Sequence, residues 1–189
     1  QEIFEDMEAE RPMNRLLQGD VGSGKTVVAA LAMARSVSCG YQAAFMAPTE
    51  ILAEQHLQAL RRFYRNTQVV IASLSGATTA NERRGIMEGL RNGGVDILVG
   101  THALIGDEVE FKSLGLVIID EQHRFGVRQR ALLGAKGKMP DVLVMSATPI
   151  PRTLALTAYG DLSLSVIDQL PPGRKPVKTV HLKTNERMR

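Results

Sequence analysis

Cysteine and aromatic residues are scarce in this sequence, and tryptophan is absent. The single cysteine, Cys39, excludes a disulfide within the chain and gives no sign of an oxidising compartment. Aromatic residues make up 4% of the chain, so we expect no platform on which nucleic-acid bases stack. Any contact with nucleic acid should therefore be mainly with its backbone. His and Cys residues nowhere have metal-ligand spacing, and we expect no structural metal.

Long hydrophobic runs are also missing. No run approaches the roughly 20 apolar residues that a membrane-spanning helix requires, so we expect no membrane contact. The N-terminus is acidic and lacks the apolar core of a signal peptide. The chain begins with Gln1 rather than methionine, and we expect it to be an excised fragment of a longer protein.

The formal net charge of +3 is concentrated at one end of the chain. The last 19 residues hold six Lys and Arg residues and one acid, which leaves 17 basic and 19 acidic residues elsewhere. The body of the chain is therefore not a basic patch. For the tail we favour a solvated linker over a phosphate-binding segment, since charge runs are usually solvated.

Short apolar runs alternate with helix-like stretches, a pattern typical of an α/β fold with a mostly parallel sheet and helices on both faces. Strands covered on both faces are nearly continuous in apolar residues. The predicted strands are Arg15–Gln18, Ala43–Ala47, Val69–Leu74, Val95–Val99, Leu116–Ile119 and Val142–Met145. A break at Pro171-Pro172-Gly173 indicates one domain over residues 1–170 and an exit segment over 171–189.

Helices are predicted between the strands. Their expected ranges are Gly24–Ser38, which should be buried on most sides, Glu50–Tyr64, a stretch from Thr79 to about Asn92, Gly126–Leu133 and Arg152–Tyr159. Thr49 is a predicted N-cap, and Leu52, His56, Leu60 and Phe63 should share one face of the helix that follows it. Thr79 and Glu82 have capping-box spacing, and their helix, which packs Ile86 and Leu90, should end near Asn92-Gly93-Gly94.

One glycine-rich segment between a predicted strand and a helix fits the phosphate-binding pattern G-x-x-x-x-G-K-[ST]. Such a loop wraps its backbone N–H groups around phosphates, and the helix that follows adds its positive N-terminal dipole. Lys25 should reach the β- and γ-phosphates, and Thr26 should offer its hydroxyl to Mg²⁺. The predicted nucleotide-binding residues are Gly19, Asp20, Val21, Gly22, Ser23, Gly24, Lys25 and Thr26.

A second acidic element, Asp120-Glu121-Gln122-His123, directly follows the apolar run Leu116–Ile119. A carboxylate at the end of such a strand can hold Mg²⁺ beside the phosphate loop, so Asp120 is a predicted metal residue. Glu121 is placed to orient and activate an attacking water. Water activation favours ATP hydrolysis over transfer to a bound acceptor, and no lid-like segment lies between Lys25 and Asp120. A P-loop small-molecule kinase is the remote alternative.

The order of these motifs, with Ser146-Ala147-Thr148 after them, is similar to that of superfamily 2 helicases, and the details resemble the RecG family. The resemblance covers residues 6–179 and rests on RLLQGDVGSGKT (15–26), APTEILAEQH (47–56), VGTHALI (99–105), IDEQHRFGVRQR (119–130), MSATPIPRTLALTAYGDL (145–162) and LPPGRKPVKT (170–179). The translocase module of transcription-repair coupling factors resembles the chain in its phosphate loop and HRFGV segment. It is the alternative, although Gln122 and PTEILAEQH favour RecG.

The resemblance implies a RecA-like domain in which the Ser-Ala-Thr strand lies between the strands that carry the phosphate loop and Asp120. It implies ATP and Mg²⁺ as cofactors, and an ATP-dependent helicase that remodels branched DNA, such as stalled forks and Holliday junctions, in recombination and repair. The implied partners are DNA, a second RecA-like domain that supplies arginine fingers, and a wedge domain, both outside this chain. A bacterial cytoplasmic location follows from the same resemblance.

Further residue roles come from the resemblance alone. Catalysis would involve Lys25, Asp120 and Glu121, with Gln122 and His123 coupling the nucleotide state to the second domain and DNA. Ser146, Ala147 and Thr148 would link hydrolysis to unwinding. The nucleic-acid backbone would contact residues at loop tips, namely Pro48, Thr49, Gly76, Arg84 and Thr101.

Simpler roles remain open for several of these residues. Thr49 can be only a helix cap. Ser146 and Thr148 can merely satisfy backbone groups at a strand end. We expect His56, on an apolar face, to be packed rather than functional. His102 can serve either role.

Overall fold

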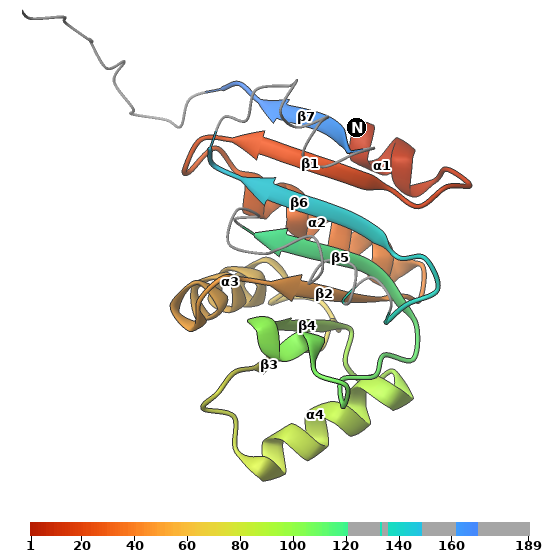
Figure 1. The fold of residues 1–189 in the computed structure, drawn as a ribbon, viewed down its shortest axis with the longest axis vertical. Coiled ribbons are helices and arrows are strands. Elements are labelled where there is room, and N and C mark those ends of the chain that lie inside the picture. Colours follow the sequence, from red (N-terminus) through yellow and green to blue (C-terminus); the bar gives the residue numbers. More distant parts are fainter. Residues whose placement is uncertain (121–132, 134–135, 149–161, 170–189) are drawn as a thin grey trace, which may run out of the picture.

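The computed structural model describes residues 1–120, 133, 136–148 and 162–169 (Figure 1). Seven strands form one sheet with the order β3-β4-β2-β5-β6-β1-β7, and all pairings among them are parallel. The strands are β1 (Asn14–Gly19), β2 (Gln42–Met46), β3 (Ile71–Leu74), β4 (Ile97–Gly100), β5 (Leu114–Asp120), β6 (Asp141–Ser146) and β7 (Ser163–Ile167). The helices are α1 (Glu2–Met7), α2 (Lys25–Ser38), α3 (Glu50–Phe63), α4 (Ala80–Asn92) and the 3₁₀ helix η1 (His102–Ile105).

Two apolar cores cover the two faces of the sheet. Leu116 and Ile118 of β5 face a core that includes residues of α2 and α3. Val117 and Ile119 face a second core shared with α4 and η1. This alternation follows from the two-residue period of a strand. The predicted three-layer α/β/α architecture is therefore confirmed, as is the place of β6 between β5 and β1.

Helices α3 and α4 begin at the threonine caps that the sequence predicts, and α4 ends at a glycine. Thr49 Oγ1 accepts a hydrogen bond from the Leu52 N–H at 3.3 Å, so Thr49 does cap α3. Thr79 and Glu82 form a reciprocal capping box at the start of α4. Gly93 ends that helix with φ of 83°, in the left-handed region that glycine tolerates.

One prediction about a helix face is wrong, and a second is wrong for one of its residues. Helix α2 is not buried on most sides, because Val27 and Leu31 are 44% and 55% exposed. In α3 the buried residues are Ala53, Leu57 and Leu60, whereas Phe63 is 48% exposed. Both helices lie in an outer layer, where a helix buries only the side that faces the sheet.

Three elements were not predicted from the sequence, namely α1, β7 and the 3₁₀ helix η1, and strands β3 and β4 begin two residues later than predicted. Of the helix predicted over 126–133, only Leu133 lies within the described residues, where it is helical and buried. The helix predicted over 152–159 and the domain boundary at residue 170 lie outside them. Within the described ranges, no helix is long and apolar enough to cross a membrane.

Arg15 connects β1 to α1 and to β7. Its side chain is buried, and its Nε donates to Asp6 Oδ2 of α1 at 2.7 Å. Its Nη1 donates to Glu2 Oε2 at 3.1 Å and to Ser165 Oγ of β7 at 2.7 Å. The guanidinium therefore holds α1 and β7 against the strand that leads into the phosphate-binding loop.

Candidate functional site

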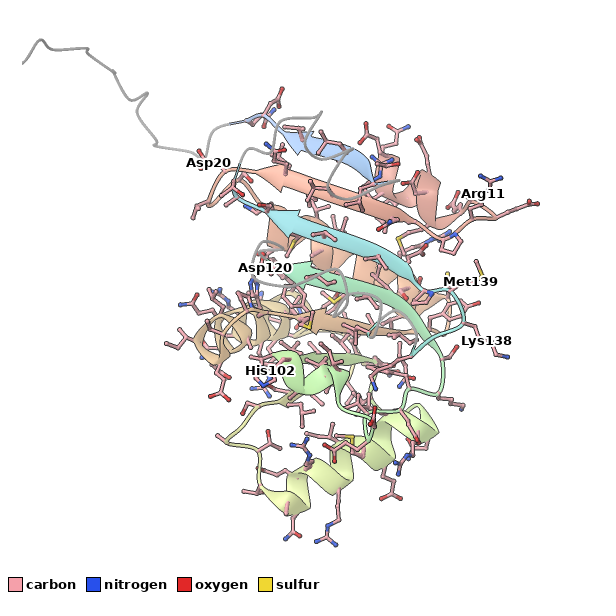
Figure 2. All side chains as sticks on the ribbon, in the orientation of Figure 1. Arg11, Asp20, His102, Asp120, Lys138 and Met139 are labelled. Atoms are coloured by element: carbon pink, nitrogen blue, oxygen red, sulfur yellow. The ribbon has the colours of Figure 1, made fainter. Side chains whose placement is uncertain are left out.

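The strand register brings three predicted motifs to one edge of the sheet. Gln18 is level with Ser146, and Asp120 is level with Met145, so β1, β6 and β5 end together. The glycine-rich loop, the Ser-Ala-Thr segment and Asp120 consequently leave the sheet side by side. Figure 2 shows Asp20 and Asp120 at this carboxyl edge, with Arg11, Lys138 and Met139 at the opposite edge.

The glycine-rich loop turns sharply into α2. Gly22 and Gly24 have φ of 81° and 98°, which a side chain would strain, and α2 begins at Lys25. Lys25 Nζ donates to the carbonyl oxygens of Gly19 at 2.8 Å and of Asp20 at 2.9 Å. The ammonium group is thus folded back onto its own loop, and these two carbonyls take up two of its three donors.

A cavity of about 440 Å³ opens between the loop, α3 and β5. It is lined by residues of the phosphate loop, by Asp120 and by Ala147, with Leu52, Gln55 and His56 of α3. Its size falls in the range of small-molecule pockets, roughly 300–1,000 Å³. Lys25, Thr26 and Asp120 therefore share one cavity, which is the arrangement that joint binding of phosphates and a metal requires.

The oxygen atoms in this cavity suit Mg²⁺. Asp120 is 7% exposed and offers a carboxylate, and Thr26 offers a hydroxyl on the first turn of α2. Hard divalent cations prefer such oxygen ligands, and Mg²⁺ is usually held by one or two carboxylates together with phosphates and water. The residues present therefore fit the metal that the sequence predicts.

His56 lies in this cavity, contrary to the expectation that it only packs. Its Nε2 is 2.7 Å from Asp120 Oδ2. Its ring also packs on Phe45, with centroids 4.5 Å apart. Sequence analysis missed the polar contact, because nothing in the spacing of α3 shows which strand end its second turn reaches.

The Ser-Ala-Thr segment forms a tight polar turn after β6. Ser146 is 1% exposed, and its Oγ lies 2.9 Å from Thr148 Oγ1. The Thr148 N–H donates to Ser146 Oγ at 3.2 Å. These bonds match the simpler role of satisfying groups at a strand end, while Ala147 lines the cavity beside Asp120.

The predicted nucleic-acid residues occupy the other half of the same edge. Met46 is level with Gly100, and Leu74 is also level with Gly100, so β2, β4 and β3 end together. Pro48 and Thr49, Thr101 and Gly76 follow these three strands. Thr101 is 5% exposed, so its side chain is mostly covered.

Gly76 and Arg84, two of the predicted nucleic-acid residues, each form a hydrogen bond with a neighbouring side chain. The Gly76 N–H donates to Glu50 Oε1 of α3 at 2.7 Å. Arg84 is exposed on α4, where its guanidinium bonds Asn81. The exposed His102 begins η1 at the same carboxyl edge (Figure 2).

Glu121, Gln122 and His123 lie outside the described residues, so their predicted roles stay predictions. Among the residues that are described, no group of three or more His, Cys, Asp or Glu side chains is arranged to hold a metal ion.

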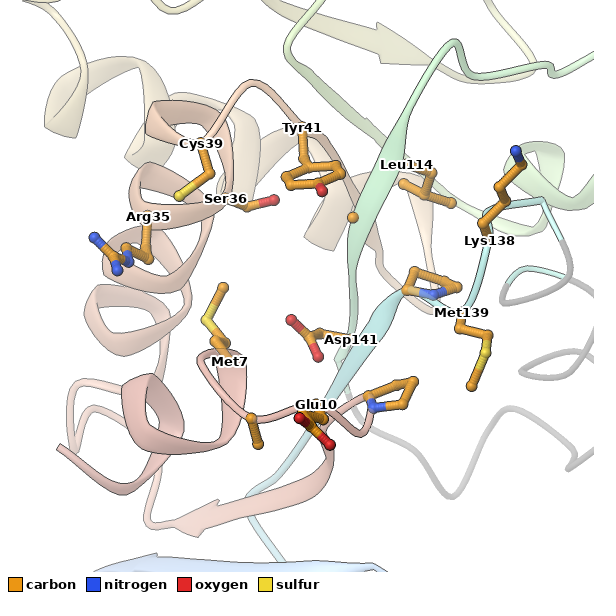
Figure 3. A pocket seen from close by; sticks show the side chains of 14 residues that line it. Met7, Glu10, Arg35, Ser36, Cys39, Tyr41, Leu114, Lys138, Met139 and Asp141 are labelled. Atoms are coloured by element: carbon orange, nitrogen blue, oxygen red, sulfur yellow. The ribbon is translucent and has the colours of Figure 1, made fainter.

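A second cavity of about 420 Å³ lies at the opposite edge of the sheet (Figure 3). Asp141 points into it, with Glu10, Tyr41 and Met139 around it. Asp141 Oδ1 accepts the Met13 N–H at 2.7 Å, and burial raises the pKa of this carboxyl above its ordinary value. None of the predicted site residues lines this cavity.

Known proteins resemble the chain over almost its whole length. It is 59% identical over 183 residues to the ATP-dependent DNA helicase RecG of Streptococcus pneumoniae, and 61% identical over 180 residues to that of Thermotoga maritima. These matches cover 97% and 95% of the chain but 27% and 23% of the relatives. The chain thus spans about a quarter of the length of the curated relatives it matches.

A solved structure gives the same result in three dimensions. The structure of RecG bound to a three-way DNA junction matches 93% of the chain with a TM-score of 0.81 and 57% identity, over 24% of that protein. The model of the DEAD/DEAH box helicase family matches residues 1–157, which is well over half of the sequence. The chain therefore belongs to the DEAD/DEAH box helicase family.

Proposed function

We propose that this chain is the ATP-binding motor domain of an ATP-dependent DNA helicase that acts on branched DNA in recombination and repair. The observation that carries the proposal is the shared cavity of Lys25, Thr26 and Asp120 at the carboxyl edge of the sheet. The similarity to RecG proteins, one of which is bound to a three-way junction, supports branched DNA as the substrate. Because the relatives are bacterial, we assign the activity to the bacterial cytoplasm.

Phosphate binding begins with the glycine-rich loop. Its backbone N–H groups and the N-terminus of α2 are suited to an anion, since the backbone amides of such a loop and the helix dipole both favour negative charge. Lys25 gives up the carbonyls of Gly19 and Asp20 and donates instead to the β- and γ-phosphates. The exchange is favourable because hydrogen bonds to charged phosphate oxygens are stronger than hydrogen bonds to neutral carbonyls. It would release Lys25 from its own loop when ATP binds.

Thr26 and Asp120 would hold Mg²⁺ in the same cavity. The metal, when bound, neutralises negative charge on the phosphate oxygens. Glu121 follows Asp120 directly, and we assign it the task of orienting and deprotonating the attacking water. Gln122, His123 and the Ser146–Thr148 turn would transmit the nucleotide state to a second RecA-like domain.

DNA would contact the other half of the carboxyl edge. Pro48, Thr49, Gly76 and Thr101 follow adjacent strands, and Arg84 would add a positive charge from α4. Small hydroxyls, backbone N–H groups and a guanidinium suit phosphate contacts, which position a protein on DNA without reading sequence. A wedge domain and the second RecA-like domain are the proposed partners in the longer protein.

Nucleotide binding tests the proposal directly. The chain should bind a fluorescent ATP analogue, and Lys25→Ala should weaken binding by roughly 10- to 100-fold, because charged hydrogen bonds contribute about 1.5–3 kcal/mol. Without an arginine finger, worth roughly 10³–10⁵ in rate, the chain alone should hydrolyse ATP slowly. DNA-stimulated hydrolysis by the chain alone at the rate of a complete helicase would refute this division of labour.

A further inference from the structure

The contact between His56 and Asp120 is short and sheltered. Their side chains are 14% and 10% exposed, and the 2.7 Å separation lies in the range of charge-assisted hydrogen bonds. The ring is also held from the side by Phe45, at an interplanar angle of 42°. A side chain fixed by packing and by one polar bond has a defined orientation rather than a choice of rotamers.

The bond has a clear direction in the neutral ring. An ionised carboxylate only accepts hydrogen bonds, so the imidazole donates through an Nε2 hydrogen. A carboxylate has two oxygens with about four acceptor positions in total. One bond to Oδ2 therefore restrains the orientation of the carboxylate and leaves acceptor positions for a metal.

The partner in this bond is the carboxylate to which we assign Mg²⁺. Groups that hydrogen-bond a metal ligand orient it, and their loss typically costs roughly 10- to 100-fold in metal affinity. A packed histidine needs a hydrogen-bond partner for its ring N–H, but packing does not require that this partner be the acid at the end of β5. The bond is thus the feature that packing alone does not explain.

We propose that His56 is a positioning residue, which holds the Asp120 carboxylate in the orientation that binds Mg²⁺ beside the nucleotide. This inference rests on the proposed function, because it needs Asp120 to bind the metal. It adds a residue of α3 to a site otherwise built from the phosphate loop and the end of β5.

Three variants of the chain separate positioning from packing. His56→Leu keeps an apolar side chain on Phe45 but removes the donor. His56→Gln keeps a donor, since its amide nitrogen corresponds to Nε2 of the ring. Gln58→Leu is the matched control: it removes an exposed amide from the same helix, where the Gln58 side chain bonds Glu54.

The measurement is equilibrium binding of a fluorescent, non-hydrolysable ATP analogue, with and without Mg²⁺. We expect His56→Leu to raise the Mg²⁺ concentration for half-maximal enhancement of binding by roughly 10-fold or more. Affinity in EDTA, which reports the phosphate loop alone, should change less than about twofold. His56→Gln should recover most of the magnesium dependence, and Gln58→Leu should match the unaltered chain.

The outcomes distinguish the two proposals. If the unaltered chain depends on Mg²⁺ and His56→Leu depends on it equally, the positioning role is wrong and the proposed function stands. The positioning role is also wrong if His56→Gln is as impaired as His56→Leu, because the shape of the ring rather than the donor would then matter. If the unaltered chain binds the analogue without any help from Mg²⁺, the metal site itself fails, and the positioning role fails with it.

Discussion

Replacing Arg15 by methionine should loosen both α1 and β7. Methionine keeps an apolar stem beside the sheet but removes the guanidinium that bonds Asp6, Glu2 and Ser165. The substitution leaves two acids near each other without their shared cation. It therefore acts on the tether rather than on the apolar core.

The cost can be bounded from the exposure of the partners. Breaking a fully buried ion pair costs about 3–5 kcal/mol, because one charge is left without compensation. Here Arg15 has a side chain 10% exposed, but those of Asp6 and Glu2 are 30% and 64% exposed. Water can solvate these acids once the guanidinium is gone, so we expect a loss of about 2 kcal/mol.

Urea unfolding measures this loss, with Arg35→Met as the control. Arg35 also bonds an acid of the same segment, Glu8, but their side chains are 46% and 62% exposed, so its removal should change stability by less than about 1 kcal/mol. Relative to the unaltered chain, amide hydrogen exchange should also speed up more in β7 than in β2, since among the described residues β7 is an edge strand that pairs with β1 alone. Equal losses in the two variants would contradict the argument.

Two further predictions concern one buried and one half-buried side chain. Gln42 is 4% exposed, and its amide donates to the Leu90 and Val95 carbonyls at 3.0 and 2.7 Å. Gln42→Leu should lower the free energy of unfolding in urea by about 2–4 kcal/mol, because both carbonyls lose their donor. An unchanged free energy of unfolding would show that water replaces these bonds. Burial raises the folded-state pKa of Asp141 above its ordinary 3.8, so stability is lost as pH rises through the interval between the two values. The advantage of Asp141→Asn over the unaltered chain should therefore be larger at about pH 7 than at about pH 4, and a gap that widens in acid would contradict the sign.

Strongly local patterns made most of the fold predictable. The phosphate loop is a contiguous motif whose glycines, lysine and threonine each have a separate physical task, and the strands of the sheet centre are continuous apolar runs. Edge strand β7 differs, because Ser163-Leu164-Ser165 alternates polar and apolar residues. Because β7 is covered on fewer sides, it is not a continuous apolar run, and the apolar pattern did not predict it.

The contact of His56 with Asp120 illustrates what sequence reasoning lacks. The two residues are 64 positions apart, and they meet because β2 lies beside β5 and α3 packs against the sheet next to them. That adjacency is a property of strand order, which the periodicity of a single helix does not contain. The packing of His56 was predicted correctly, but its hydrogen bond with Asp120 was not predicted. A helix face that is mostly apolar can still contact a polar residue at the end of a strand.

Helix α3 physically joins the two halves of the carboxyl edge. Near its start, Glu50 accepts the Gly76 N–H at 2.7 Å on the side of β3, where we propose that DNA binds. Six residues later, His56 bonds Asp120 on β5. Six residues of helix span only about 9 Å, so a rigid movement of α3 at Glu50 also moves His56. A DNA phosphate that takes the Gly76 N–H would displace the Glu50 carboxylate, and the helix that carries Glu50 also carries His56, to which we assign the orientation of Asp120. The two hydrogen bonds thus place one helix in contact with both the proposed DNA-binding segment and the proposed metal ligand.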